Sequence, residues 1–523
     1  MSVAGEARRL PLGASALPAA QGVSLGRILL IGAICAIPVV LYILFFMEPF
    51  MRDEGFYAAT AQIMLDGGVP YRDAFDNKPP LIFVWYAISF LMFGENVWAP
   101  RLLVSLLLSL TTLLIYFEGR LLFSHRAAVC AALAFALSMG LAVFETNANT
   151  EYFMLLPLTG AVLSYTLAER RDDDRLYGLA GALAGISILT KETSLFVLFL
   201  FMALSAHKVW RDEGWRALAG RTFFRRIAWL NAGCAFAGIV VALPFVLTGT
   251  FDEMFDAIVL YTLDYVGRVS SGDRLVAIAK MPLYLFWLAG PLAVFSYLGM
   301  ARLLRERSDQ AYLLVGWVIV TFLGVLAAGR FSAHYYVMAL PVLALIVPAG
   351  LSVLQRAGRI RRQVLVSLAA VSIIPMVVLN AQAYLQPTAA ERHEAKYSYN
   401  DFSKWETESA EFAEWLKQRT SPNDYIYNLG FQSELYFYSD RKSPTPYLFY
   451  HPFIAGQEHV DAALADLKAN PPLFVIDSAT YEKANQFTYY PQDLMAWVRG
   501  NYDYLGKMFY ADVYRLKDGS GGN

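Results

Sequence analysis

Residues 29–46 read LLIGAICAIPVVLYILFF, an uninterrupted apolar run with Arg8, Arg9 and Arg27 on its N-terminal side. A helix needs about 20 apolar residues to cross the roughly 30 Å hydrocarbon core of a bilayer. The run is longer than the apolar region of a cleaved signal peptide, and no small-residue cleavage site follows it. We therefore expect an uncleaved first membrane span.

The composition of the whole chain points the same way. Of its 523 residues, 57% are hydrophobic and 17% are charged, against roughly 45–50% and about 25% in ordinary globular proteins. The net charge of −1 gives no basic field that would attract nucleic acid. The cysteines, Cys35, Cys130 and Cys234, lie in apolar runs with neither metal nor disulfide spacing, and the six histidines form no HExxH motif. We expect a polytopic membrane protein that works without a cofactor.

Ten further apolar runs give about eleven predicted spans in total. They are 99–117, 127–144, 151–168, 176–190, 193–206, 227–247, 281–298, 311–328, 335–351 and 364–379. The run at 80–93 is ambiguous, because counting it as a span would reverse every later loop. If it lies along the membrane surface instead, the basic stretches at 120–126, 208–226, 302–307 and 356–362 all become cytoplasmic, as cytoplasmic loops usually are. We therefore expect a cytoplasmic N-terminus, and Trp85, Tyr86 and Trp98 suit an interfacial segment.

Beyond residue 379 the composition becomes polar and aromatic. Helical patterns at 401–418, 460–468 and 492–499 alternate with strand-like segments at 425–429, 473–476 and 504–516. Such alternation predicts a small α/β domain. We expect a cytoplasmic tail at 1–26, an all-α membrane domain at 27–383 with its first outer loop at 47–98, and an outer α/β domain at 384–523.

On this topology, ionisable and amide side chains gather at the outer ends of the spans. They are Asp53, Glu54, Lys78, Asn149, Glu151, Lys191, Arg330 and His334. Each has a structural explanation of its own, such as a helix-terminal charge, a turn before proline or an interfacial anchor. Ionisable groups near a bilayer are costly, however, and they usually face a cavity or a partner. Acids and bases that converge on one face predict a site for an anionic, membrane-held substrate.

The first outer loop resembles a known family. RDEGFY at 52–57 and DNKPPL at 76–81 are similar to the corresponding loop of the GT-C fold glycosyltransferases. More narrowly, the loop is similar to that of the family 39 group, which holds the protein O-mannosyltransferases and the bacterial transferase that adds aminoarabinose to lipid A. Looser similarities are NTE at 149–151, LTK at 189–191 and GRF at 329–331, followed by His334, Tyr335 and Tyr336.

The resemblance implies a bacterial inner-membrane enzyme that takes a sugar from a polyprenyl-phosphate donor at the periplasmic face. It implies that Asp53 is the catalytic base, that Lys78 contacts the donor phosphate and that Glu151 is an acid of the second outer loop. Asn77 departs from the pattern, since relatives often have Glu before the lysine. We expect Glu54, Lys78, Asn149, Glu151, Lys191, Arg330, His334 and Tyr335 to bind substrate.

Chemistry argued from the residues fits these roles. A phosphate leaving group needs positive charge, which Lys78 and one or more of Lys191, Arg330 and Arg268 can supply. The acceptor hydroxyl needs a base, and in-line attack opposite the phosphate would invert the anomeric carbon. The expected acceptor is a lipid A, an envelope glycan or a protein. The alternative functions are a membrane transporter, a flippase of lipid-linked sugars, or a scaffold that binds through its outer domain. Separately, the outer carboxylates could hold a divalent metal.

Overall fold

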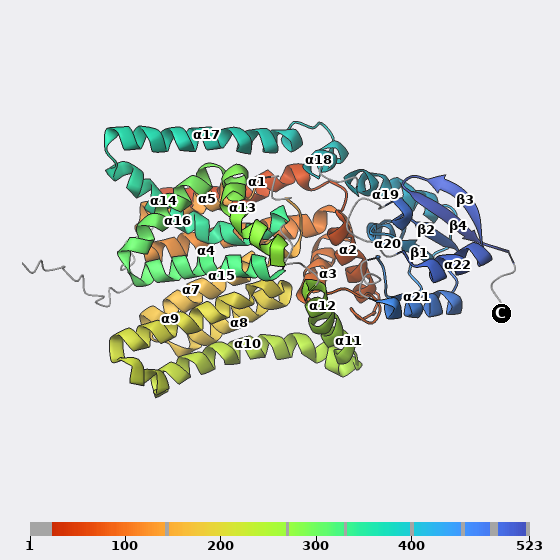
Figure 1. The fold of residues 1–523 in the computed structure, drawn as a ribbon, viewed down its shortest axis with the longest axis horizontal. Coiled ribbons are helices and arrows are strands. Elements are labelled where there is room, and N and C mark those ends of the chain that lie inside the picture. Colours follow the sequence, from red (N-terminus) through yellow and green to blue (C-terminus); the bar gives the residue numbers. More distant parts are fainter. Residues whose placement is uncertain are drawn as a thin grey trace, which may run out of the picture.

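A computed structural model describes residues 24–141, 146–267, 271–328, 332–397, 402–450, 456–481 and 490–518. Figure 1 shows a helical bundle at one end of the molecule and a small sheet with its own helices at the other. Short helices lie between these two parts. The predicted fold class, an all-α membrane domain with a small α/β domain, is confirmed.

Apart from α13 and α14, the long helices of the bundle follow the predicted apolar runs. They are α1 (Leu25–Tyr42), α4 (Trp98–Leu122), α5 (His125–Ser138), α7 (Leu155–Arg171), α8 (Asp174–Thr190), α9 (Phe196–Glu213), α10 (Arg221–Thr248), α13 (Ser271–Ala289), α14 (Pro291–Glu306), α15 (Asp309–Ala328), α16 (Leu340–Arg356) and α17 (Arg359–Tyr384). Short 3₁₀ segments extend or precede three of them: η1 (Ile43–Phe45), η3 (Glu192–Leu195) and η6 (Ala333–Ala339). Another, η4 (Trp215–Ala219), links α9 to α10.

Within the described residues, seven helices are long and apolar enough to cross a membrane, and each coincides with a predicted span. Three further predicted spans fall on the shorter helices α5, α7 and α8, of 14, 17 and 17 residues. The end of the predicted span at 127–144 lies outside the described residues. The connections α9–α10, α14–α15 and α16–α17, which carry the basic stretches, lie at the end of the bundle opposite the sheet (Figure 1). The chain is therefore a multi-pass membrane protein.

The predicted span at 281–298 is wrong. The helix stops at Gly290, whose φ of 49° and ψ of −122° are far from helical, and Pro291 begins the next helix. The Tyr297 hydroxyl donates to the Pro282 carbonyl at 2.6 Å. Residues 15 apart in one straight helix would be about 22 Å apart, so this bond means that the chain bends sharply. A hydropathy window does not reveal such a break, because it records how apolar the residues are and not which backbone conformation they adopt.

The run at 80–93 forms the short helix α3 (Leu81–Phe93), outside the long helices. Pro80 precedes it, and Gly94 ends it with a φ of 85°. Thirteen residues are too few to span a bilayer. The Trp85 indole N–H donates to Thr190 Oγ1 at 3.2 Å, which fixes α3 against the end of α8. The other short helices of this layer are α2 (Arg52–Leu65), α6 (Thr150–Phe153), α11 (Phe251–Phe255), the π-helical turn η5 (Asp256–Tyr261) and α12 (Thr262–Gly267).

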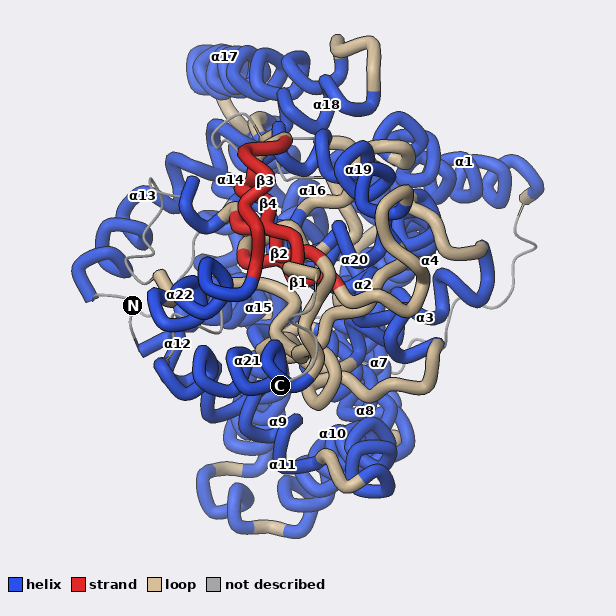
Figure 2. Tube along the Cα trace, turned by 90° about the vertical axis from the view of Figure 1, so that its right-hand side faces the viewer, coloured by secondary structure: helices blue, strands red, loops and turns tan. Residues whose placement is uncertain are grey.

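The C-terminal part has the predicted α/β character. Its sheet has the order β1-β2-β4-β3, with β1 and β2 parallel and the other pairs antiparallel. The strands are β1 (Ile426–Leu429), β2 (Phe474–Asp477), β3 (Tyr502–Met508) and β4 (Ala511–Leu516). The helices are α18 (Ala389–Lys396), α19 (Phe402–Lys417), α20 (Glu434–Ser439), α21 (Gln457–Ala469) and α22 (Gln492–Asn501), with a 3₁₀ turn, η8 (Ala479–Tyr481). Viewed from the sheet end, the strands lie in front of the bundle (Figure 2).

The segment at 504–516, expected to be a single strand-like stretch, is a hairpin of β3 and β4. Its turn contains Phe509, which has a φ of 52°. Strands β1 and β2 are buried on both faces, since every residue of the two strands is buried. This explains why both read as short apolar runs in the sequence.

Candidate functional site

The candidate site is built on the first turn of α2, which lies between the bundle and the sheet (Figure 1). Met51 has extended backbone angles, and its N–H donates to Glu54 Oε2 at 3.1 Å, so that the helix begins at Arg52. Acidic side chains in a first turn interact favourably with the positive end of the helix dipole. Asp53 and Glu54 therefore both stabilise the start of α2, but their surroundings differ.

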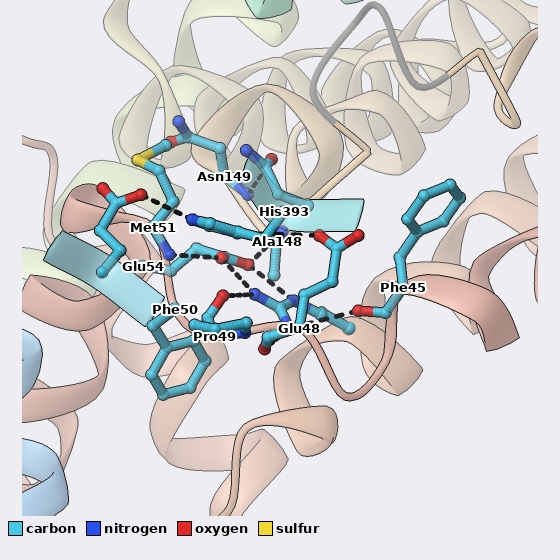
Figure 3. A network of polar contacts seen from close by, with 12 residues as sticks. Phe45, Glu48, Pro49, Phe50, Met51, Glu54, Ala148, Asn149 and His393 are labelled. Carbon is cyan, nitrogen blue, oxygen red and sulfur yellow. Dashed lines mark hydrogen bonds and ion pairs between the residues drawn. The ribbon is translucent and has the colours of Figure 1, made fainter. Parts of the chain in front are cut away.

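Glu54 does not occupy the substrate-facing place that we expected for it. It is fully buried, and its carboxylate accepts hydrogen bonds from Arg101 Nη2 at 2.6 Å and Arg101 Nε at 3.1 Å. Glu54 Oε1 also accepts the Ala148 N–H at 2.8 Å. Figure 3 shows Glu54 within this network, with Met51 and Ala148 close by. Since both oxygens are already bonded inside the protein, the geometry makes Glu54 a structural residue.

Arg101 extends the same network to the end of the first span. Its guanidinium donates to the backbone carbonyls of Phe45, Phe46, Glu48 and Pro49. The carbonyls at the end of a helix have no partner within the helix, so Arg101 satisfies these groups. The end of the first span, the start of α2 and the 146–149 segment are thereby joined around one ion pair.

Asp53 points to a different set of groups. Its Oδ2 lies 3.4 Å from Asn149 Nδ2, and Asn149 Oδ1 accepts the Tyr57 hydroxyl at 3.2 Å. Asn149 caps α6, because the same Oδ1 accepts the Thr150 N–H at 2.8 Å. Burial acts to raise the pKa of Asp53, but the charges of Lys78 and Arg52 outweigh it, and the pKa lies below its ordinary value. Asp53 is thus ionised at neutral pH and has oxygen lone pairs to accept a proton.

The charge of Lys78 is attracted by two carboxylates, those of Asp76 and Asp53. Its Nζ is 3.3 Å from Asn77 Oδ1. Desolvation acts to lower the pKa of Lys78, but Asp76 and Asp53 outweigh it and raise that pKa above its ordinary value. Lys78 is therefore a fixed positive charge close to Asp53, as a phosphate-binding group requires.

Asp76 is a member of this group that the sequence argument did not single out. Its side chain is 5% exposed, and its Oδ1 accepts the Asn77 N–H at 2.7 Å. Burial raises the pKa of Asp76 to about 6, with Lys78 acting against the rise and Asp53 adding to it. The sequence did contain a signal for Asp76, because it is the first residue of the DNKPP motif at 76–80.

A second charged pair comes from other segments. Lys191 Nζ lies 3.2 Å from Glu151 Oε1, and both side chains are almost fully buried. The same ammonium is 4.9 Å from the centre of the Tyr335 ring, a cation–π distance. His334, which packs edge-on against Tyr335 with ring centroids 4.7 Å apart, contributes to the electrostatic surroundings of both Asp53 and Glu151. Arg268 and Arg330 lie outside the described residues, so their roles stay predictions.

Segments far apart in the chain therefore meet beside the first turn of α2. Asp53, Lys78, Asn149, Glu151, Lys191, His334 and Tyr335 are linked by contacts or by mutual electrostatic influence. The arrangement combines an ionised carboxylate with lysine ammonium groups, which suits acid–base chemistry on an anionic substrate. Within the described residues, no group of three or more histidine, cysteine or acidic side chains has the geometry of a metal site.

Comparison with known proteins agrees with this picture. Residues 77–245 match the family described as dolichyl-phosphate-mannose-protein mannosyltransferase. The undecaprenyl phosphate-alpha-4-amino-4-deoxy-L-arabinose arabinosyl transferase of Pseudomonas aeruginosa (strain LESB58) is 26% identical over 295 residues, which cover 53% of this chain and 50% of the relative. The enzyme of this description from Pseudomonas fluorescens is 23% identical, covering 68% of this chain and 64% of the relative. The chain spans about half the length of the Pseudomonas aeruginosa relatives it matches.

Solved structures match over a larger share of the chain. The crystal structure of ArnT from Cupriavidus metallidurans, bound to undecaprenyl phosphate, has a TM-score of 0.61 at 17% identity, covering 95% of this chain and 99% of ArnT. The Archaeoglobus fulgidus oligosaccharyltransferase has a TM-score of 0.55 at 14% identity, covering 94% and 74% of the two chains. These findings confirm the GT-C fold and the resemblance to the family 39 group of glycosyltransferases.

Proposed function

We propose that this protein transfers a single sugar from a polyprenyl-phosphate donor to an acceptor on the outer face of a bacterial inner membrane. The observation that carries the proposal is the place of the Asp53 carboxylate, whose Oδ2 lies 3.4 Å from the Asn149 amide nitrogen and whose pKa is lowered by the charges of Lys78 and Arg52. The names of the relatives support a lipid-phosphate donor, since they are described as undecaprenyl phosphate aminoarabinose transferases. The bound lipid in the ArnT structure supports the same class of donor.

In the proposed reaction, an acceptor oxygen attacks the anomeric carbon of the donor sugar as the bond from that carbon to the phosphate oxygen breaks. Asp53 takes the proton of the attacking hydroxyl, and the polyprenyl phosphate leaves with the bonding electrons. General-base help of this kind typically contributes about 10²–10⁴ in rate. Attack from the side opposite the phosphate inverts the anomeric centre.

Lys78 is the group we assign to the donor phosphate, where negative charge grows as the bond breaks. Preorganised positive charge at such a position is often the largest single contribution to catalysis. Lys191 already neutralises Glu151, so we assign this pair and the Tyr335 ring to the sugar and its linkage. The assay below measures the specificity. It distinguishes a pentose from a hexose in the donor, and a lipid A from an envelope glycan or a protein as the acceptor.

The test is an assay with the purified protein in lipid nanodiscs and radiolabelled undecaprenyl-phosphate sugars. The donors are undecaprenyl phosphates that carry either 4-amino-4-deoxy-L-arabinose or mannose. The acceptors are lipid A, envelope glycan and a peptide. We expect Asp53→Asn to abolish transfer, whereas Asp66→Asn, at an exposed carboxylate after the same helix, keeps it. Near-wild-type transfer by Asp53→Asn would remove Asp53 as the base.

The competing flippase is tested in the same experiment. Vesicles with the donor in one leaflet report its movement across the bilayer without any acceptor. Movement without transfer, for every donor and acceptor, would replace the enzyme by a flippase.

The orientation is tested with Asp66→Cys in a chain whose three native cysteines are serine, because a membrane-impermeant thiol reagent added to whole cells labels only an outward-facing loop.

A further inference from the structure

The first turn of α2 is held by the C-terminal domain. The first four N–H groups of a helix have no partner inside it, and the Met51 side chain before α2 offers only a thioether sulfur, a weak acceptor. The Arg52 N–H donates to Glu406 Oε1 at 2.9 Å. Glu406 belongs to α19, 354 residues further along the chain. A carboxylate at the start of a helix is also favoured by the helix dipole.

Glu406 is itself fixed in place. Its side chain is 2% exposed, and its Oε2 lies 2.6 Å from Nε2 of the fully buried His393 in α18. His393 Nδ1 is 3.9 Å from Glu48 Oε2, and Glu48 also pairs with Lys396. One Glu406 oxygen therefore serves α2 while the other is held by α18. A side chain anchored in this way can fix the position of the backbone that it binds.

Three more contacts join the same domain to the same turn. The Phe50 N–H donates to the Tyr438 hydroxyl at 2.9 Å. The Arg52 guanidinium lies 5.6 Å from the centre of the Phe431 ring, a cation–π distance. Gly55 is in such close contact with Glu434 that an added Cβ would come within 2.6–2.9 Å of its atoms. The residues on both sides of Asp53 are thus bound by the C-terminal domain.

We propose that the C-terminal domain is a working part of the catalytic unit, and that Glu406 is a positioning residue that holds the first turn of α2 and so directs Asp53. This inference rests on the proposed function of Asp53. Glu406 acts through the Arg52 amide and does not touch the reacting atoms. Misplacement of a catalytic group by about 1 Å can cost on the order of 10²-fold in rate, so a loosened first turn lowers turnover.

The experiment compares Glu406→Ala, Glu406→Gln and Glu411→Gln in the intact protein in nanodiscs. Glu411 is exposed on the same helix and serves as the matched control. We expect Glu406→Ala to lower kcat about tenfold or more and to leave the donor KM within about twofold. Glu406→Gln keeps an oxygen acceptor for the Arg52 amide and restores most of the turnover. Glu411→Gln matches the wild type.

Amide hydrogen exchange of the peptide at 50–57 gives a readout that needs no substrate. In Glu406→Ala we expect faster exchange in that peptide and unchanged exchange in α4, because only the local hold is lost. Unchanged exchange at 50–57, or a rise in donor KM with kcat preserved, overturns the positioning role. A wild-type protein without transferase activity would defeat the proposed function, while the exchange data would still test the hold on α2.

Discussion

Arg101 and Glu54 form a buried ion pair with two hydrogen bonds, of 2.6 and 3.1 Å, and neither side chain is more than 1% exposed. The pair joins the first span to α2 directly beside Asp53. Sequence reasoning had assigned Glu54 to substrate as one of the ionisable groups gathered at the outer ends of the spans. Its complete burial makes it part of the structure that supports Asp53.

Glu54→Gln should therefore lower stability more than it changes donor binding. Removing one partner of a buried ion pair costs about 3–5 kcal/mol, because the other charge stays buried without compensation. We expect a clear drop in the thermal unfolding midpoint in detergent, with the donor KM of the folded fraction unchanged. Glu213→Gln, at an exposed position, is the control. A raised KM with wild-type stability would restore Glu54 to the substrate site.

Lys78→Ala should weaken donor use. A hydrogen bond to a charged group contributes about 1.5–3 kcal/mol, so the KM for the polyprenyl-phosphate sugar should rise roughly ten- to a hundredfold. The measurement is donor saturation at fixed acceptor, with Lys442→Ala, whose side chain is 68% exposed, as the control. Unchanged saturation would reject contact between Lys78 and the phosphate.

Asp76→Asn should stabilise the substrate-free protein at neutral pH. The folded pKa of Asp76 is raised to about 6 from 3.8, so the folded protein binds more protons than the unfolded chain between these values. Stability is therefore lost as pH rises from about 4 to about 6 and stays reduced above that. Asparagine removes the buried charge and keeps an oxygen for the Asn77 N–H. Unfolding midpoints at pH 4 and pH 7.5 should show a gain at the higher pH alone.

Gly55→Ala should disturb the docking of the C-terminal domain. Its Cβ would lie 2.8 Å from the backbone nitrogen of Glu434, closer than real Cβ contacts, so α2 and α20 must separate. We expect lower thermal stability and faster proteolysis between α17 and α19. Gly500→Ala is the control, because that helical glycine has nothing within 4 Å of an added Cβ. Equal behaviour of the two variants would contradict the close approach.

Transfer should survive removal of metal. The proposed chemistry relies on Asp53 and on lysine charge, so dialysis against EDTA should leave kcat and KM unchanged. Loss of activity that returns with one added divalent cation would assign a metal to the outer carboxylates instead.

Much of the architecture could be predicted from the sequence because membrane helices obey a strong local rule. An apolar run of sufficient length must be a helix in lipid, and basic connections favour one orientation. The run at 80–93 was kept out of the spans because counting it would have reversed every later loop, and it forms a helix of 13 residues. The break at Gly290 was missed, because hydropathy takes no account of backbone conformation.

Site residues were harder to predict, because a role depends on partners that the sequence does not place. Asp53 and Glu54 are adjacent and chemically alike, yet only Glu54 meets a buried arginine. Asp76 was overlooked because its burial, which raises its pKa to about 6, cannot be read from the sequence. The contact between Glu406 and Arg52 joins residues with no shared motif, and it follows only from the folded arrangement.

The bonds from Phe50 and Arg52 to partners 388 and 354 positions later set an order of events during biogenesis. At about 5–20 residues per second, a ribosome needs tens of seconds, roughly, between making the aspartate and making the carboxylate that steadies its turn. A nascent chain therefore contains Asp53 before it contains the residues of the C-terminal domain that hold the first turn of α2. Under the proposed function, transfer therefore begins only after the C-terminal domain has been made.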